Sequence, residues 1–194
     1  MINKNIIQKQ SPNKQNNKYL QCVYLSVALL SCYCVMTNSY IIHCSNFLGI
    51  FCVFDLYFIR RMDMFLHHIL VLGMVDYMNK HNHIKTIIEI TTILLSVEIS
   101  TIFLTINNLL ENVNNISIIK NVNKLMFIST FFYYRIYNYG YYLILNKNLY
   151  NISLTYSNNS FELFEFFYGI HTLFILNLYW LWLIFNRMVQ MYRK

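Results

Sequence analysis

Two adjacent histidines, His67 and His68, lie about two helical turns into an apolar run that follows Arg61. An ionisable side chain at membrane depth is costly, so it marks a functional site by default. Neighbours on a helix point about 100° apart, so the two imidazoles would flank a cavity from two sides. Asp63, one turn before His67, has the spacing at which a carboxylate accepts an imidazole N–H. The other ring nitrogen would then be a base or nucleophile.

The alternative reading of this pair is structural. Neighbouring helices would then satisfy both imidazoles, and neither would react. A third reading, a di-iron desaturase or hydroxylase, needs many more histidines than the pair and His81-Asn82-His83 supply. A channel or transporter is also disfavoured, because broken helices rich in Gly and Pro are missing from this chain of four glycines and one proline.

The composition places the histidines in a membrane. The chain has 194 residues, of which 57% are hydrophobic and 12% charged, about half the charged share of an average soluble domain. The apolar residues are gathered in blocks of roughly twenty, the length that crosses a bilayer as a helix. The sequence therefore predicts an all-α membrane protein, a bundle or barrel of six transmembrane helices around a polar interior chamber.

The blocks also predict the domain organisation. Residues 1–17 are expected to be a disordered cytosolic tail, 18–188 the six-span membrane domain and 189–194 a cytosolic C-terminus. A polar connection, 107–124, has room for an interfacial helix, and 146–160 is expected to be a loop. The expected spans are 19–36, 41–59, 62–78, 86–106, 125–145 and 161–185.

Positive charges predict the orientation of these spans. If the N-terminal tail is cytosolic, Lys80, Lys85 and Lys147 fall on the opposite side and eleven other Lys and Arg residues on the cytosolic side. Arg135 lies within the membrane. This distribution obeys the positive-inside rule, so both termini are expected in the cytosol. Topology thus accounts for the net charge of +7, and no nucleic-acid partner is expected.

The five cysteines predict neither a disulfide framework nor a zinc site. Their number is odd and they show no C-x-x-C spacing. No metal and no resident cofactor are expected.

Depth groups the other intramembrane polar residues with the histidine pair. At about 1.5 Å per residue, five helices bring polar groups to one slab, roughly 8–15 Å inside the cytosolic boundary. These groups are Asp55, His67, His68, Glu98, Ser100 and Asn177, with Arg135 near the midplane. A looser set, expected toward the lumenal side as packing or a vestibule, is His43, Asp76, Glu89 and His171. Such side chains must face protein or water, so a shared chamber is expected; the alternative is a set of unrelated helix–helix hydrogen bonds.

Several segments, in order along the chain, resemble the TLC-domain family, which includes ceramide synthases, translocon-associated proteins and lipid-regulating members. They are Phe54-Asp55-Leu56, Asp63 with His67-His68, Glu98-Ile99-Ser100-Thr101-Ile102-Phe103, Phe131-Phe132-Tyr133-Tyr134-Arg135-Ile136 and Asn177-Leu178-Tyr179-Trp180. The chain departs from the family pattern at Ile102, where proline is usual, and at Thr105, where asparagine is usual. It also lacks the His-Asp and the further Asp that follow the pair in ceramide synthases. It therefore looks closer to the lipid-regulating branch.

The resemblance implies a multi-pass protein of lipid metabolism in an endoplasmic reticulum-type membrane. The implied reaction is acyl transfer from a fatty acyl-CoA co-substrate to a lipid amine or hydroxyl. His67 and His68 would be catalytic, one as base or acyl carrier and the other at the oxyanion or leaving thiolate. The supporting residues would be Asp55, Asp63, Glu98, Ser100, Arg135 and Asn177. The alternative is a non-enzymatic protein that binds membrane lipids, regulates membrane composition, or assists cargo or a translocon.

Overall fold

The computed structural model describes residues 18–59, 61–111, 113, 116–146, 148–157 and 160–192. Every regular element in these ranges is a helix, which confirms the all-α prediction. The α-helices are α1 Lys18–Thr37, α2 Ile41–Leu56, α3 Met62–Lys80, α4 Lys85–Ser96, α5 Glu98–Leu110, α6 Ser117–Thr130, α7 Leu149–Tyr156, α8 Ser160–Leu163 and α9 Gly169–Tyr192. Three further segments are π-helical, η1 Phe131–Asn138, η2 Gly140–Ile144 and η3 Phe164–Tyr168.

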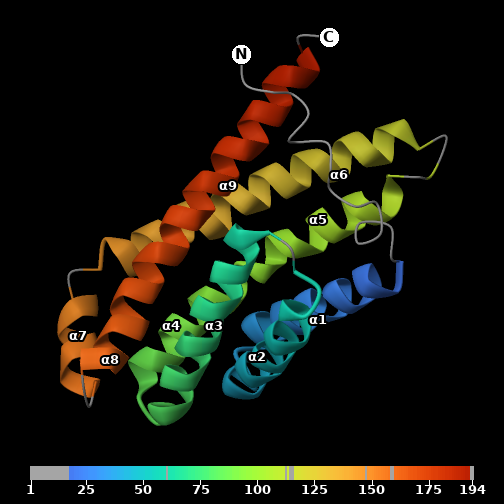
Figure 1. The fold of residues 1–194 in the computed structure, drawn as a ribbon. Coiled ribbons are helices and arrows are strands. Elements are labelled where there is room, and N and C mark those ends of the chain that lie inside the picture. The colour runs from blue at the N-terminus through green and yellow to red at the C-terminus, as the bar shows by residue number, and fades with distance from the viewer. Residues whose placement is uncertain are drawn as a thin grey trace.

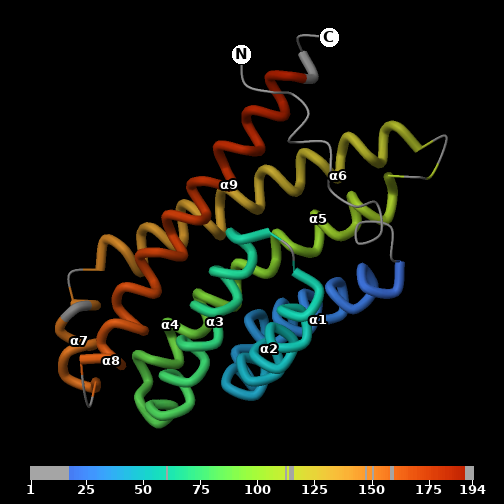
Figure 2. The backbone as a smooth tube through the Cα atoms, in the orientation of Figure 1, coloured from blue at the N-terminus to red at the C-terminus, as the bar shows by residue number. Residues whose placement is uncertain are grey.

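The long helices run in alternating directions along one bundle (Figure 1). α4 continues into α5, α6 into η1 and η2, and α8 through η3 into α9, so each of these groups is one extended rod (Figure 2). Within the described residues, three helices are long and apolar enough to cross a membrane: Lys18–Thr37, Lys85–Leu110 and Ser160–Gln190. α2 is a shorter apolar helix.

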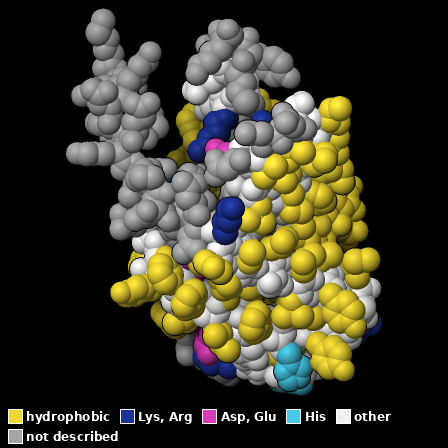
Figure 3. Space-filling model, turned by 90° about the vertical axis from the view of Figure 1, so that its right-hand side faces the viewer, with side chains coloured by type: hydrophobic (Ala, Val, Ile, Leu, Met, Phe, Trp, Pro, Cys, Tyr) yellow, Lys and Arg dark blue, Asp and Glu magenta, His cyan; other side chains and the backbone are white. Residues whose placement is uncertain are grey.

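Much of the surface of the bundle is apolar. Large hydrophobic side chains point outward along the helices, for example Ile50, which is 69% exposed, and Leu125 and Trp182. Figure 3 shows one broad face covered by such side chains. Intramembrane polar residues are turned inward instead, and Asp55 on the same helix as Ile50 is only 1% exposed. This inversion is what an integral membrane protein needs, because lipid solvates apolar groups and cannot satisfy polar ones.

The largest buried cluster joins α3, α4, the η1–η2 rod and α9 through Tyr77, Ile87, Tyr139 and Ile170. The Tyr139 hydroxyl donates to the Ile170 carbonyl oxygen at 2.9 Å, which pins η1 against α9. Arg135 lies four residues before Tyr139 on the same rod, so the same contact turns its side chain into the bundle.

Some boundaries differ from the sequence-based expectation. The expected loop 146–160 contains α7, which forms because Leu149 and Ser153 pack into the interior with 1% and 0% exposure. The apolar part of the connection 107–124 is not a separate interfacial helix but the start of α6, which continues without a break into η1. The expected cytosolic tail 1–17 lies outside the described residues.

Candidate functional site

Arg135 is the centre of the first polar cluster. Its three guanidinium nitrogens reach two other rods: Nε donates to Ser100 Oγ at 2.8 Å, Nη2 to Thr101 Oγ1 at 3.0 Å and Nη1 to Asn177 Oδ1 at 3.3 Å. Glu98 Oε1 lies 3.9 Å from Nη2 and supplies a compensating charge. The structure therefore brings together Glu98, Ser100, Arg135 and Asn177, four residues that the sequence had grouped by depth.

A second cluster, on the other side of the histidine pair, ties α1 to α2 and α3. His68 Nε2 lies 3.2 Å from Asp55 Oδ2, and His68 Nδ1 lies 2.8 Å from the Met64 carbonyl oxygen. The Tyr24 hydroxyl donates to the other Asp55 oxygen. Since Nδ1 must donate to the carbonyl, the contact with Asp55 holds one more proton, either on Nε2 or on the carboxyl group. Both ring nitrogens of His68 are thus occupied.

Tyr24 is the residue of this cluster that the sequence reasoning missed. The chain contains 17 tyrosines, and nothing in the spacing of Tyr24 separates it from the others. Its role becomes visible only when α1 is placed beside α2.

His67 is bonded differently from His68. Its Nδ1 atom is buried and has no hydrogen-bond partner among the residues that the structure describes. The ring packs edge-on against Trp180, with centroids 5.2 Å apart, and against His68 at 5.4 Å. His67 also lines a cavity that His68 does not reach. The two histidines therefore face different surroundings, as their adjacency on a helix requires.

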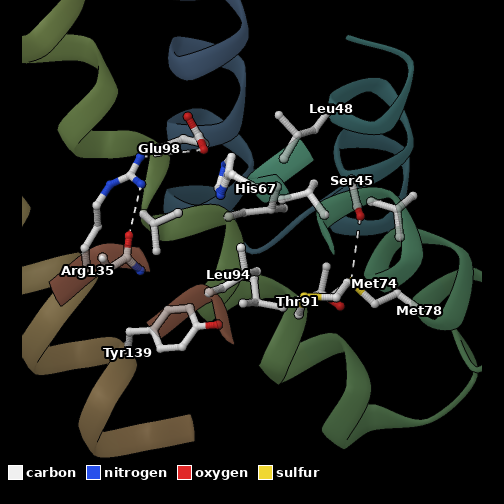
Figure 4. A pocket seen from close by; sticks show the side chains of 16 residues that line it. Ser45, Leu48, His67, Met74, Met78, Thr91, Leu94, Glu98, Arg135 and Tyr139 are labelled. Carbon is white, nitrogen blue, oxygen red and sulfur yellow. Dashed lines mark hydrogen bonds and ion pairs between the residues drawn. The ribbon is translucent and has the colours of Figure 1, made fainter. Parts of the chain in front are cut away.

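The cavity has a polar end and an apolar end. Figure 4 shows His67, Glu98 and Arg135 around the polar end, which Asn177 also lines. The rest of the wall is mostly aliphatic and sulfur-containing side chains from α2, α3 and α4, such as Leu48, Met74 and Leu94. The space open to the centres of water molecules is about 40 Å³. That is room for a few waters and far too little for a lipid chain.

Asp63 does not make the expected contact with His67. Its carboxylate instead accepts two hydrogen bonds from Arg61, at 3.0 and 2.5 Å, and one from Trp180 Nε1 at 2.8 Å. Asp63 lies in the first turn of α3, where its side chain is directed back toward Arg61 and across to α9. It is linked to His67 through the Trp180 ring.

The looser set of polar residues does not form a second site. His43 is exposed, and the other three make contacts within their own helices. These contacts are Lys80–Asp76 at 2.7 Å, Lys85–Glu89 at 3.9 Å and His171 Nδ1 to the Phe167 carbonyl oxygen at 2.8 Å. In the described part of the chain, no group of three or more His, Cys, Asp or Glu side chains is placed to hold a metal ion.

No curated protein and no solved structure gives a significant match. The family model of the TLC domain matches residues 6–186, which include both polar clusters and the cavity. This match confirms the resemblance seen in the motifs at the level of the family, which is linked to lipid metabolism. The chain belongs to the TLC domain family of helical membrane proteins.

Proposed function

We propose that this protein transfers an acyl group from a fatty acyl-CoA to a lipid amine or hydroxyl, with His67 as the reacting residue. The observation that carries the proposal is the buried Nδ1 of His67, which has no partner in the described residues and stands at the wall of a cavity. An unsatisfied buried polar atom costs about 1–3 kcal/mol. An imidazole kept in this state is poised to accept a proton or an acyl group.

The neighbours of His67 suit this role. As the acceptor lipid attacks the thioester, His67 removes the proton of the attacking amine or hydroxyl group. The proton then passes to the leaving CoA thiolate. Alternatively, His67 attacks the thioester carbonyl and is acylated as the CoA thiolate leaves; the acceptor then displaces the imidazole, and the acceptor's proton goes to the thiolate. Arg135 binds the carbonyl oxygen of the Asn177 amide, which leaves the Asn177 NH2 group as a donor at the cavity wall for the developing oxyanion.

His68 acts in this proposal by holding the site together. Its nitrogens are engaged with Asp55 and the Met64 carbonyl, and its ring supports that of His67. It therefore supports the His67 ring by packing, rather than by contact with the substrate.

We also propose a six-span topology with both termini in the cytosol, in an endoplasmic reticulum-type membrane. The alternating rods of Figure 1 support it, because the start of α1, the α5–α6 connection and the end of α9 lie toward one end of the bundle. Lys18, Lys120 and Arg187 lie at that end, and Lys80 and Lys85 at the other. In this topology His67 lies in the cytosolic half of the membrane, the side from which acyl-CoA would reach it.

The decisive assay uses purified protein in lipid vesicles with acyl-CoA and long-chain bases, and mass spectrometry of the products. His67→Ala is expected to abolish product formation. His171→Ala is the matched control, because His171 is also on a membrane helix but its Nδ1 bonds the Phe167 carbonyl oxygen one turn earlier on the same rod; this variant should retain turnover. Product formation by His67→Ala at the wild-type rate would remove this residue from the mechanism.

A second candidate is a non-enzymatic lipid-binding protein or regulator of membrane composition, as in the branch that the motifs resemble most. The fully bonded guanidinium of Arg135 favours it, because the polar cluster is complete without a substrate. This candidate predicts intact lipid bound to the purified protein and no product in the same assay.

A further inference from the structure

A hydrogen bond between α3 and α9 connects the edge of the bundle to the reactive histidine. Trp180 Nε1 donates to Asp63 Oδ2 at 2.8 Å, across 117 positions of the sequence. Asp63 is held in turn by the Arg61 guanidinium, whose Nε and Nη2 atoms reach the two carboxylate oxygens. Arg61 is about half exposed, with 44% of its side chain accessible. Asp63 Oδ2 thus accepts from both Arg61 and Trp180, and the second Arg61 bond, to Oδ1, fixes the orientation of the carboxylate.

The other contacts of the Trp180 ring are with the site itself. The His67 ring meets it at 5.2 Å between centroids with a 66° angle between planes. The Arg135 guanidinium carbon lies 5.8 Å from its centroid, within reach of a cation–π attraction. One indole therefore touches both the unpartnered imidazole and the charged centre of the polar cluster.

The indole has one polar atom, the Nε1 donor. Its hydrogen bond to Asp63 selects one rotation of the ring about its two side-chain torsions. A ring without that bond would leave a partly buried donor without its acceptor and would turn to find another one. The surfaces presented to His67 and Arg135 would then change.

We infer that Asp63 and Trp180 are positioning residues for His67: the Asp63 carboxylate fixes the Trp180 indole, and the indole fixes the imidazole. The importance of this contact for turnover rests on the proposed function of His67. The contact itself is a property of the bundle and can be measured without any acyl transfer.

Trp182 provides a matched internal control. It lies two residues after Trp180 on α9 and is 58% exposed, so it faces away from the site. The sequence contains only these two tryptophans. A Trp182→Phe background therefore isolates the fluorescence of Trp180 and leaves the proposed machinery intact.

The experiment compares Asp63→Asn with Asp63→Ala in the Trp182→Phe background, in purified protein in lipid vesicles. Asparagine keeps an acceptor oxygen for Nε1–H, and alanine removes it. The first readout is the fluorescence anisotropy of Trp180. The second is the rate at which diethyl pyrocarbonate acylates His67, followed by peptide mass spectrometry, with His171 as the reference histidine.

We expect Asp63→Ala to lower the anisotropy of Trp180 and to raise the acylation rate of His67 several-fold, with His171 unchanged. Asp63→Asn should restore both values to near those of the parent. Wild-type anisotropy and acylation rate in Asp63→Ala, or equal changes in the two variants, would overturn the inference. If Asp63→Ala does not fold, Trp180→Phe, which keeps an aromatic ring without the donor, should raise the His67 rate, and an unchanged rate would overturn it.

These readouts separate the inference from the proposed function. An acyl-transfer assay on the same samples can fail in every variant, including the parent, while anisotropy and His67 reactivity still respond to Asp63. That pattern would refute acyl transfer and retain the positioning contact. Normal acyl transfer, together with Trp180 anisotropy and His67 reactivity that do not respond to Asp63 substitutions, would refute the positioning contact and retain acyl transfer.

Discussion

Replacing Arg135 by methionine tests whether the polar cluster holds the bundle together. Methionine fills a similar length but removes the bonds to Ser100, Thr101 and Asn177 and leaves Glu98 without its nearest cation. Interhelical hydrogen bonds in membrane proteins average about 0.6 kcal/mol each, and breaking a buried ion pair costs about 3–5 kcal/mol. Because Glu98 lies at 3.9 Å rather than in a hydrogen bond, we expect the lower end, about 3 kcal/mol.

The assay is reversible unfolding in mixed micelles with increasing denaturing detergent, followed by the helical circular dichroism signal. Arg135→Lys is the first comparison, because it keeps the charge but cannot reach three partners with one planar fork. It should lose about 1–2 kcal/mol, the value of the lost hydrogen bonds. Adding Glu98→Gln to Arg135→Met should recover part of the loss, since the uncompensated carboxylate is then gone.

A stability of Arg135→Met within about 0.5 kcal/mol of wild type, the usual range of surface substitutions, would refute the reasoning. So would a Glu98→Gln substitution that makes Arg135→Met less stable. Either result would mean that water, rather than Ser100, Thr101, Asn177 and Glu98, solvates the guanidinium.

Two further stability predictions use the same unfolding assay. Tyr24→Phe removes the hydroxyl that donates to Asp55 and should cost about 1 kcal/mol; no loss would show that the Asp55 carboxylate does not depend on α1. Gly140→Ala would place a Cβ atom 3.2 Å from the Phe174 ring, whereas the same change at Gly169 meets only a flexible methionine at 3.6 Å. Both changes gain helix propensity, so Gly140→Ala should be less stable than Gly169→Ala by about 1–3 kcal/mol, and equal stabilities would contradict the close approach.

Depth could be predicted from the sequence because a helix rises by a fixed amount per residue. The grouping of Glu98, Ser100, Arg135 and Asn177 used only their distance from the charged ends of their helices, and the structure brings these four together. The same argument placed Asp55 near the histidine pair, and Asp55 contacts His68. The bonds of Arg135 to Ser100 and Asn177 are helix–helix hydrogen bonds that share one centre, so they are not unrelated.

Direction around the helix axis could not be predicted in the same way. Asp63 has the spacing to reach His67 on one helix, but Trp180 from α9 competes for the carboxylate and binds it. Tyr24 donates to Asp55 because the side of α1 that carries Tyr24 faces α2. Such pairings depend on how helices far apart in the sequence rotate against one another, which no local pattern encodes. α7 was missed for a related reason. The burial of Leu149, which stabilises this helix, depends on packing against parts of the chain that are distant in the sequence.

The two polar clusters differ from His67 in what a substitution should change. Asp55, His68 and Arg135 have protein partners at hydrogen-bond or ion-pair distance, and these contacts join helices. His67 Nδ1 has none among the described side chains, although it is buried in the same slab. This atom therefore joins no helices within the described part of the chain. Substitutions in the Arg135 cluster should lower stability, while His67→Ala should leave the fold intact and remove the chemistry.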